Sequence, residues 1–224
     1  MRKALLVSSA LSLSILAAVP ASALVVIADF SSGAVAQSIT SGSLLDFQNG
    51  SMSGGDRGLK MEVTSNAFSL SYQVNTVTGT FNISSQAGVD GYTQIGYGYF
   101  NNSGAFAFQD MNLNLSAENR FEIDVLSHDQ PVSVTMSLRS AGVTEMLTKN
   151  LPGNMVNTPT TLTYNFSEWS TINFADVDQT LVEFNTQVSG DLTLDSIEAV
   201  PEPATMALLA GAAALARRKR VKKA

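Results

Sequence analysis

The chain has 224 residues and a formal net charge of −6, with 13 Lys and Arg against 19 Asp and Glu. It contains no cysteine and one histidine, which excludes disulfides, thiol nucleophiles, cysteine-ligated zinc or iron–sulfur centres, and a multi-histidine metal site within one chain. Residues 24–199 hold five of the basic and 18 of the acidic residues, a difference of −13, and so acidic a surface excludes a nucleic-acid partner.

The first segment, residues 1–23, has the pattern of a cleavable signal peptide. Two basic residues open the chain, an apolar run follows, and Pro20 ends the run. The small residues Ala21 and Ala23 then fit the pocket of a signal peptidase. We therefore expect a short signal helix, cleavage by signal peptidase after Ala23, and export of the mature chain.

The middle segment, residues 24–199, predicts one all-β domain. It is rich in Ser, Thr, Asn and Gly, and it lacks long helical periodicity. Apolar and polar residues alternate cleanly over 120–126, 132–139 and 161–166, as in strands with one buried face. Further candidate strands are 24–30, 58–64, 68–74, 77–83, 92–99, 105–108, 111–115, 143–149, 180–187 and 191–199.

Turn-forming sequences such as Asn49-Gly50 and Pro152-Gly153 separate these candidates. About thirteen short strands at such spacings predict a two-sheet antiparallel sandwich, specifically a jelly roll. The signal helix and a C-terminal apolar sorting helix flank it. A domain of this length buries enough surface to need no metal or cofactor for stability.

The last segment, residues 200–224, reads as a membrane-directed tail. Val200, Pro201, Glu202 and Pro203 come first, and the two prolines predict an extended, accessible stretch outside any central strand. An uncharged run follows over 204–216, which as a helix measures about 20 Å against a hydrocarbon core of about 30 Å. The tail closes with a basic stop on the cytoplasmic side, formed by Arg217, Arg218, Lys219 and Arg220. Such a run predicts transient inner-membrane insertion.

The string VPEPATMALLAGAAALARRKR resembles the PEP-CTERM sorting signal of exosortase-bearing Gram-negative bacteria. The resemblance implies recognition by an exosortase, cleavage near the Pro-Glu-Pro, and delivery to the cell envelope, the surface or an extracellular polysaccharide matrix. The alternative is a tail-anchored protein that is never processed.

The layout of the middle segment resembles the galactose-binding-like jelly rolls used as carbohydrate-binding modules. The matching pieces are Ile27-Ala28-Asp29-Phe30, Leu115-Ser116, Phe174-Ala175-Asp176-Val177 and Leu192-Thr193-Leu194-Asp195-Ser196-Ile197. In jelly rolls of that kind a calcium ion often bridges the first and last strands, and the resemblance places Asp29 and Asp195 as its ligands. The alternative is that each carboxylate satisfies loop amides at a strand end.

A tyrosine- and glycine-rich stretch over 91–99 is the candidate glycan-binding platform. Tyr97 and Tyr99 would share one strand face, and an exposed ring can stack on the apolar face of a sugar. The competing interpretation, which we favour, is a sheet surface where tyrosines pack over glycines.

Signatures of catalysis are absent from the sequence, including G-x-S-x-G, the P-loop and H-E-x-x-H. His128 lies in a turn-like Ser-His-Asp-Gln-Pro sequence, which favours a solvated histidine. Two close carboxylate pairs, Asp176 with Asp178 and Glu122 with Asp124, are the acid–base option, although an acidic domain forms such pairs by chance. We therefore expect a non-enzyme.

The sequence as a whole predicts an exported surface or matrix protein whose jelly roll binds, or packs into, extracellular polysaccharide. One alternative is a purely structural envelope protein without a small ligand. The other is a polysaccharide hydrolase that uses one of the carboxylate pairs.

Overall fold

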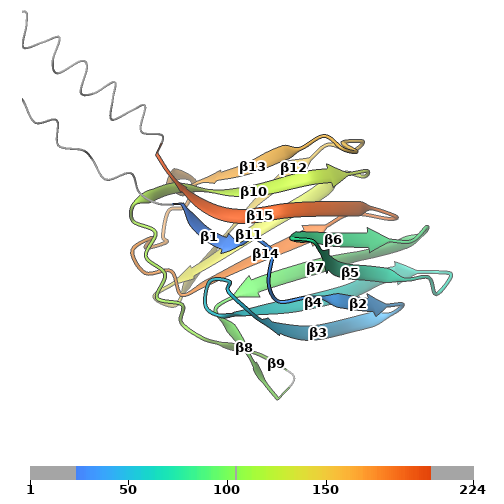
Figure 1. Ribbon diagram of the computed structural model, residues 1–224, viewed down its shortest axis with the longest axis horizontal. Helices are drawn as coiled ribbons and strands as arrows, with labels where there is room; N and C mark the ends of the chain where they lie inside the picture. Colours follow the sequence, from blue (N-terminus) through green and yellow to red (C-terminus); the bar gives the residue numbers. More distant parts are fainter. Residues whose placement is uncertain (1–23, 104, 203–224) are drawn as a thin grey trace, which may run out of the picture. The chain divides into compact units, whose positions relative to one another are not determined.

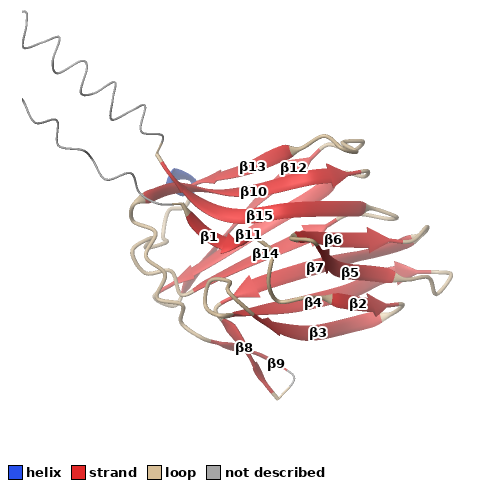
Figure 2. Cartoon of the chain, viewed as in Figure 1, coloured by secondary structure: helices blue, strands red, loops and turns tan. Residues whose placement is uncertain are grey.

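The computed structural model describes residues 24–103 and 105–202, which form a β-sandwich (Figure 1). Nearly all of its regular structure is strand, with one short 3₁₀ helix, η1 (Phe166–Glu168) (Figure 2). The strands are β1 (Val25–Ala28), β2 (Ala36–Ile39), β3 (Gly42–Asn49), β4 (Asp56–Asn66), β5 (Tyr72–Val77), β6 (Thr80–Ser85), β7 (Val89–Tyr97), β8 (Tyr99–Asn102), β9 (Ala105–Phe108), β10 (Glu118–His128), β11 (Val132–Ser140), β12 (Val143–Leu151), β13 (Thr160–Asn165), β14 (Gln179–Asn185) and β15 (Asp191–Pro201).

Two large antiparallel sheets make up the sandwich. The seven-stranded sheet has the order β13-β10-β15-β6-β5-β2, and β1 pairs with β15 beyond the end of β6. The six-stranded sheet has the order β12-β11-β14-β7-β4-β3, and a separate hairpin joins β8 to β9. The predicted all-β, two-sheet antiparallel sandwich is therefore confirmed. The predicted signal and sorting helices lie outside the described residues.

The core lies between the inner faces of the two sheets. Along β10, Phe121, Ile123 and Val125 are fully buried, while the residues between them are half-exposed. Along β11, Val134 and Met136 are fully buried in the same alternating way. Each such side chain contributes about 1.5–3 kcal/mol on burial. A slip by one residue would expose the whole row, so the hydrophobic pattern fixes the register.

The sequence missed three strands and added one. Strand β8 was merged with β7 in the single candidate 92–99. Strands β2 and β3 were not predicted, because their sequences alternate weakly and both lie at sheet edges, where burial is least. The predicted strand 111–115 is wrong, since it is a loop held to the chain before β14 by an isolated bridge between Leu113 and Val177.

The start of the sorting motif belongs to the sheet. Strand β15 continues through Val200 to Pro201, both half-buried, and Pro201 pairs with Glu118 of β10. The expectation of an extended conformation is confirmed at these two residues. The expectation that Pro201 lies outside a central strand is wrong, because a proline is tolerated as the last residue, where no further ladder bond is needed. In the part of the chain that the structure describes, no helix is long and apolar enough to cross a bilayer.

Candidate functional site

The outward face of the six-stranded sheet carries a patch that we call the polar tract. Its inward neighbours are buried core residues such as Leu59, Ile95 and Val182, so the alternate residues of β4, β7 and β14 point away from the core. The register places them on adjacent rungs, with Lys60 opposite Gln94. The polar tract consists of Lys60, Glu62, Tyr92, Gln94 and Glu183.

Hydrogen bonds organise the polar tract into two groups. Lys60 Nζ donates to Tyr92 Oη at 2.7 Å and forms a 2.8 Å salt bridge with Glu62, and Tyr92 Oη donates to the same carboxylate. The hydrogen bond from Lys60 holds the pKa of Glu62 below its usual value, and the same bond raises the pKa of Lys60. Gln94 Nε2 donates to Glu183 at 2.7 Å. The half-exposed groups are thus oriented before any ligand arrives.

An aromatic row lies next to the polar tract, formed where the β8–β9 hairpin packs on Gly58 and Gly96 of the six-stranded sheet. Ring centroids lie 5.1 to 5.8 Å apart along it, and Arg139 stacks on its last ring at 4.0 Å. That last ring, Phe108, remains 60% exposed. The aromatic row consists, in spatial order, of Phe47, Phe106, Tyr99 and Phe108.

Two glycines allow the hairpin to approach the sheet. A Cβ on Gly58 would lie 2.7 Å from the ring of Phe106, and one on Gly96 would lie 2.8 Å from the ring of Tyr99. The favoured interpretation of this stretch, tyrosine packed over glycine, is therefore confirmed for Tyr99 on Gly96.

The expectation that Tyr97 and Tyr99 share one exposed strand face is wrong. Strand β7 ends at Tyr97, because Gly98 has a φ of +81° and its missing Cβ would lie 2.5 Å from the carbonyl of Asp178. Tyr97 is fully buried in the core, where burial raises its pKa to about 12. Tyr99 is half-exposed and belongs to the next strand. A ligand can therefore contact only the second of the two rings.

The predicted calcium ligands have other roles in this structure. Asp29 follows β1 and accepts hydrogen bonds from the Ser31 backbone nitrogen at 3.0 Å and its hydroxyl at 2.7 Å, which lower the carboxyl pKa. This matches the alternative, a carboxylate satisfying loop groups. Asp195 is exposed on β15. Calcium binding by these two residues stays a prediction.

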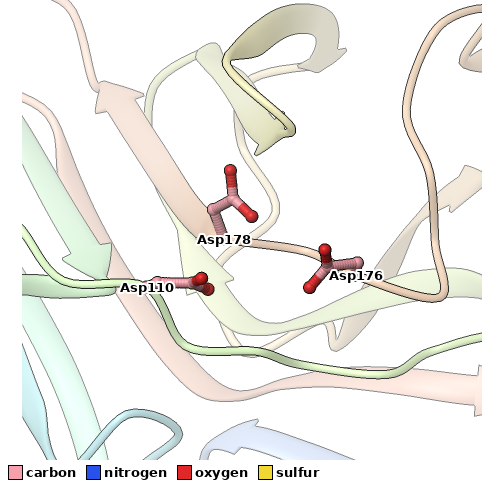
Figure 3. Close-up of side chains that lie close together, drawn as sticks. All are labelled: Asp110, Asp176 and Asp178. Carbon is pink, nitrogen blue, oxygen red and sulfur yellow. The ribbon is translucent and has the colours of Figure 1, made fainter.

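The structure gathers a different acidic cluster, formed by Asp110, Asp176 and Asp178 (Figure 3). One carboxylate oxygen of each lies within 4.8 Å of the others, and Asp110 and Asp176 are exposed. The sequence suggested the pair Asp176 and Asp178 but not Asp110, which arrives from the loop after β9. Backbone bonds from Met111 to Asp178 and between Leu113 and Val177 hold that loop there, and no sequence spacing signals them.

His128 is not the solvated turn residue that the sequence favours. It ends β10 and is 1% exposed, with Nδ1 lying 3.0 Å from the Gln130 carbonyl oxygen. It lines a small pocket of about 120 Å³ together with Asp129 and Asp191. Asp129 in turn accepts a hydrogen bond from the Asp191 backbone at 2.7 Å, so this carboxylate braces a turn.

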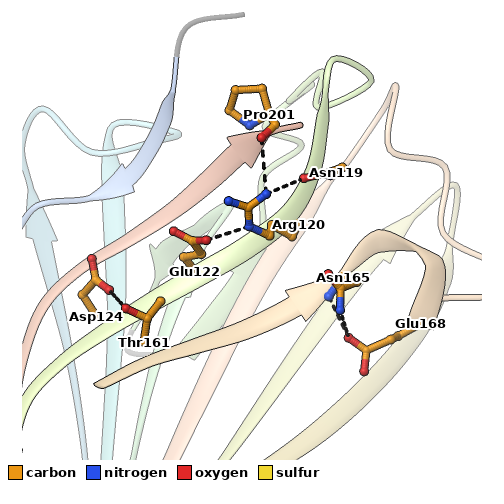
Figure 4. Close-up of polar contacts among 8 residues, drawn as sticks. All are labelled: Asn119, Arg120, Glu122, Asp124, Thr161, Asn165, Glu168 and Pro201. Carbon is orange, nitrogen blue, oxygen red and sulfur yellow. Dashed lines mark hydrogen bonds and ion pairs between the residues drawn. The ribbon is translucent and has the colours of Figure 1, made fainter. Parts of the chain in front are cut away.

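The second predicted carboxylate pair is engaged in the sheet (Figure 4). Glu122 bonds to Arg120 at 2.6 Å. Asp124 accepts hydrogen bonds from Thr161 at 2.6 Å and Ser196 at 3.3 Å. The two carboxylates thus have structural partners on the outer face of the seven-stranded sheet.

Solved structures with a similar architecture include carbohydrate-binding modules. A family 11 carbohydrate-binding module of a cellulosomal cellulase from Clostridium thermocellum covers 80% of this chain and 95% of its own, at 12% identity and a TM-score of 0.38. TmCBM61, solved with β-1,4-galactotriose, covers 63% of this chain and 88% of its own, at 10% identity and a TM-score of 0.38. A family 29 module covers 73% and 88%, at 11% identity and a TM-score of 0.36. At these values the likeness concerns architecture and carries nothing about a ligand.

The sorting prediction is confirmed by a family match. Residues 199–220 match the PEP-CTERM protein-sorting motif, which takes in both the Pro-Glu-Pro and the basic stop. The chain therefore carries an exosortase sorting motif, and this motif indicates export and a cell-surface or extracellular location. Among curated proteins, none matches this chain.

Proposed function

We propose that the exported sandwich binds extracellular polysaccharide on the outer face of its six-stranded sheet. The observation that carries this proposal is the contact between two kinds of surface, the aromatic row and the preorganised polar tract. Sugar rings have apolar faces that stack on aromatic rings and hydroxyls that pair with charged and amide groups. Both kinds of group lie on one face here.

The aromatic row supplies the stacking surface. Phe108 leaves 60% of its surface exposed although Arg139 covers one side of the ring. Tyr99, its partner across the hairpin, lies at a centroid distance of 5.8 Å, so Phe108 packs against a ring on one side and the Arg139 guanidinium on the other. A rigid ring loses little entropy when a sugar stacks on it.

The polar tract supplies the hydrogen bonds. Tyr92 Oη is held between Lys60 and Glu62, which leaves the remaining lone pairs and N–H groups of these three residues for sugar hydroxyls. Glu183 likewise keeps acceptor positions beyond its bond from Gln94. Hydrogen bonds to such charged groups contribute more than neutral ones, about 1.5–3 kcal/mol each.

The test is affinity electrophoresis of the full-length protein in gels containing the producing cell's own matrix polysaccharide. Phe108→Ala and Tyr92→Ala are expected to weaken binding at least about fivefold each, the loss of one stacking ring or one oriented hydroxyl. Phe68→Ala is the matched control, because Phe68 is an exposed phenylalanine, 73% accessible, in the loop between β4 and β5.

The outcomes separate the candidate functions. If the three variants bind equally well, the polysaccharide binds to a face of the protein other than the outer face of the six-stranded sheet. The variants are Phe108→Ala, Tyr92→Ala and Phe68→Ala. An absence of saturable binding by the wild-type protein would favour the structural envelope role. Shortening of the polysaccharide during incubation, lost on Asp176→Asn, would favour the hydrolase. That the protein is not an enzyme stays a prediction until this last assay is done.

A further inference from the structure

The fold brings the two ends of the sandwich domain together. Strand β1 pairs antiparallel with β15, so that Val25 lies opposite Ala199. Val25 is two residues after the predicted signal cleavage at Ala23, and Ala199 begins the sorting motif. Both points where the chain leaves the domain therefore lie at the same end of the seven-stranded sheet.

The first residues of the sorting motif are held in the sheet from one side. The pairing of β1 with β15 ends at Ala199, whereas β10 pairs with Val200 through Arg120 and with Pro201 through Glu118. A register shift between Glu118 and Arg120 marks a bulge at Asn119, and bulges re-aim the side chains beside them.

The bulge coincides with a clamp formed by Arg120 (Figure 4). Arg120 Nη1 donates to the Pro201 carbonyl at 3.4 Å and to Asn119 Oδ1 at 3.0 Å, and Nε bonds to Glu122 at 2.6 Å. The Arg120 and Glu122 side chains are only 20% and 24% exposed. The guanidinium is therefore fixed on both sides while it holds the last residue of β15.

Little chain separates this clamp from the predicted membrane segment. The uncharged run begins at Ala204, three residues after Pro201. A fully extended chain of that length spans at most about 11 Å. An enzyme that binds an extended peptide needs the peptide's backbone groups for its own hydrogen bonds. Val200 and Pro201 are paired with β10, and the Pro201 carbonyl oxygen already accepts the hydrogen bond from Arg120. The folded domain thus covers part of the peptide segment that the exosortase must bind.

We propose that the Arg120 clamp gates sorting: exosortase reaches the Pro-Glu-Pro only when the last two rungs of β15 open away from β10. Opening of a strand end costs far less than global unfolding, so a folded domain can still be processed. The Arg120 clamp sets the fraction of molecules in which the end of β15 is open to exosortase. This inference rests on the sorting motif and is independent of polysaccharide binding.

The test follows processing of the full-length protein in a host with an active exosortase, by pulse-chase and the change in size. Arg120→Met removes the three hydrogen bonds and keeps the aliphatic stem. We expect it to be processed about three- to tenfold faster, because the bond to the Pro201 carbonyl, the one of the three that opening breaks, is worth about that factor. Glu122→Gln, which weakens the clamp from its other side, is expected to give a smaller increase.

Two further variants decide between gating and a general loss of stability. Lys149→Met removes a comparable ion pair, to Glu168 at 2.9 Å, on another part of the sandwich, and is expected to leave processing at the wild-type rate. Inserting Gly-Ser-Gly-Ser-Val-Pro between Pro201 and Glu202 leaves β15 intact and rebuilds the one complete Val-Pro-Glu-Pro six residues further along the chain, beyond the sheet. In that chain Arg120→Met is expected to have no effect.

The proposal is overturned by a wild-type processing rate for Arg120→Met or by an equal acceleration by Lys149→Met. It is also overturned by a persistent effect of Arg120→Met in the chain with the insertion. Slower processing of Arg120→Met would also overturn it, since the arginine would then present the segment rather than withhold it. Urea unfolding followed by Trp169 fluorescence checks that each variant is folded.

Discussion

Glu122 of β10 and Glu198 of β15 lie directly opposite each other on neighbouring strands of the seven-stranded sheet. Burial raises the pKa of Glu198, and the negative charges of Asp124, Glu122 and Asp195 raise it further. Among the described residues, Arg120 forms a salt bridge with Glu122 and none with Glu198. The sheet therefore carries a like-charge pair beside the sorting motif, and like charges directly opposite each other destabilise a sheet.

The first prediction is that Glu198→Gln stabilises the protein at neutral pH. The pKa of Glu198 is higher in the folded state than its ordinary value of 4.5, so the unfolded chain loses this proton first. The free energy of unfolding therefore falls as pH rises from about 4.5 through the raised folded pKa. Replacing the carboxyl by an amide removes that loss, an expected gain of about 0.5 kcal/mol at pH 7 and little at pH 4.

Urea unfolding at pH 4 and pH 7, followed by Trp169 fluorescence, measures this gain. The matched control is Glu62→Gln, because Lys60 and Tyr92 lower the pKa of Glu62, and this change is expected to destabilise at pH 7. A loss of stability for Glu198→Gln at pH 7 would show that its hydrogen bonds outweigh the repulsion.

A second prediction concerns acid stability through Glu145. This carboxylate accepts hydrogen bonds from the backbone and hydroxyls of Ser170 and Thr171, at 2.7 to 3.0 Å, and these bonds, led by the Ser170 backbone, lower its pKa to about 2. Its contribution is therefore complete above pH 4.5 and is lost as pH falls through 2. The Glu145 carboxylate links β12 to the loop that contains Trp169.

We expect Glu145→Gln to be less stable than wild type at pH 7, with the difference shrinking toward pH 2. Trp169 reports the contact directly, since it is 6% exposed and neighbours Ser170. Its emission should shift to longer wavelength in the variant at pH 7. An unchanged emission together with a constant stability difference down to pH 2 would contradict the assignment.

Strands with strong alternation could be predicted from sequence, and those without could not. Residues 120–126 and 132–139 alternate because one face of each strand packs on the core, and both strands were found. Strand β3 packs one side on β4 and has no neighbour on the other, so its sequence is under weaker constraint and shows little alternation. Strand β13 is also an edge but alternates cleanly and was found, so alternation rather than edge position decides what pattern reasoning finds.

The candidate site was only partly predictable, because it depends on one backbone angle. The sequence drew attention to the tyrosine–glycine stretch, which does contribute Tyr92 and Tyr99. It placed Tyr97 and Tyr99 on one strand, whereas Gly98, with φ +81°, ends the strand between them. The pairing of Phe106 with Phe47 joins residues far apart in sequence and left no local signal.

A third prediction concerns Arg57, which is fully buried. Its Nε donates to Gln48 Oε1 at 3.1 Å, and its guanidinium lies 5.4 and 5.7 Å from the ring centroids of Phe30 and Phe81. None of the three salt bridges among the described residues includes it. The rings and carbonyl oxygens thus solvate a charge that lacks a carboxylate partner, an arrangement with a large desolvation cost.

We expect Arg57→Ala to lose about 3–4 kcal/mol, since it leaves a cavity and unpaired polar groups. Arg57→Met fills most of the volume without a charge, and its loss should be smaller by at least about 1 kcal/mol. The urea midpoints of the two variants measure the difference. Equal losses would show that the hydrogen bonds, rather than the packing, account for the contribution of Arg57.

The last prediction tests whether the hairpin must lie on the sheet for binding. A Cβ at Gly96 would lie 2.8 Å from the Tyr99 ring and 3.1 Å from Leu181. Gly96→Ala should therefore cost about 1–3 kcal/mol by forcing the ring away. If the clash with Tyr99 is the cause, Tyr99→Ala should recover at least about 1 kcal/mol of that cost in a double-mutant cycle.

Displacing the hairpin also moves Phe108, so Gly96→Ala should weaken polysaccharide binding beyond its effect on stability. Gly142→Ala is the control of similar instability, because Gly142 has a φ of +80° in the turn between β11 and β12, and nothing lies within 4 Å of its missing Cβ. An alanine there strains the backbone and leaves the hairpin in place. If both variants bind polysaccharide equally well, the position of the hairpin has no part in recognition, and the polar tract alone must account for it.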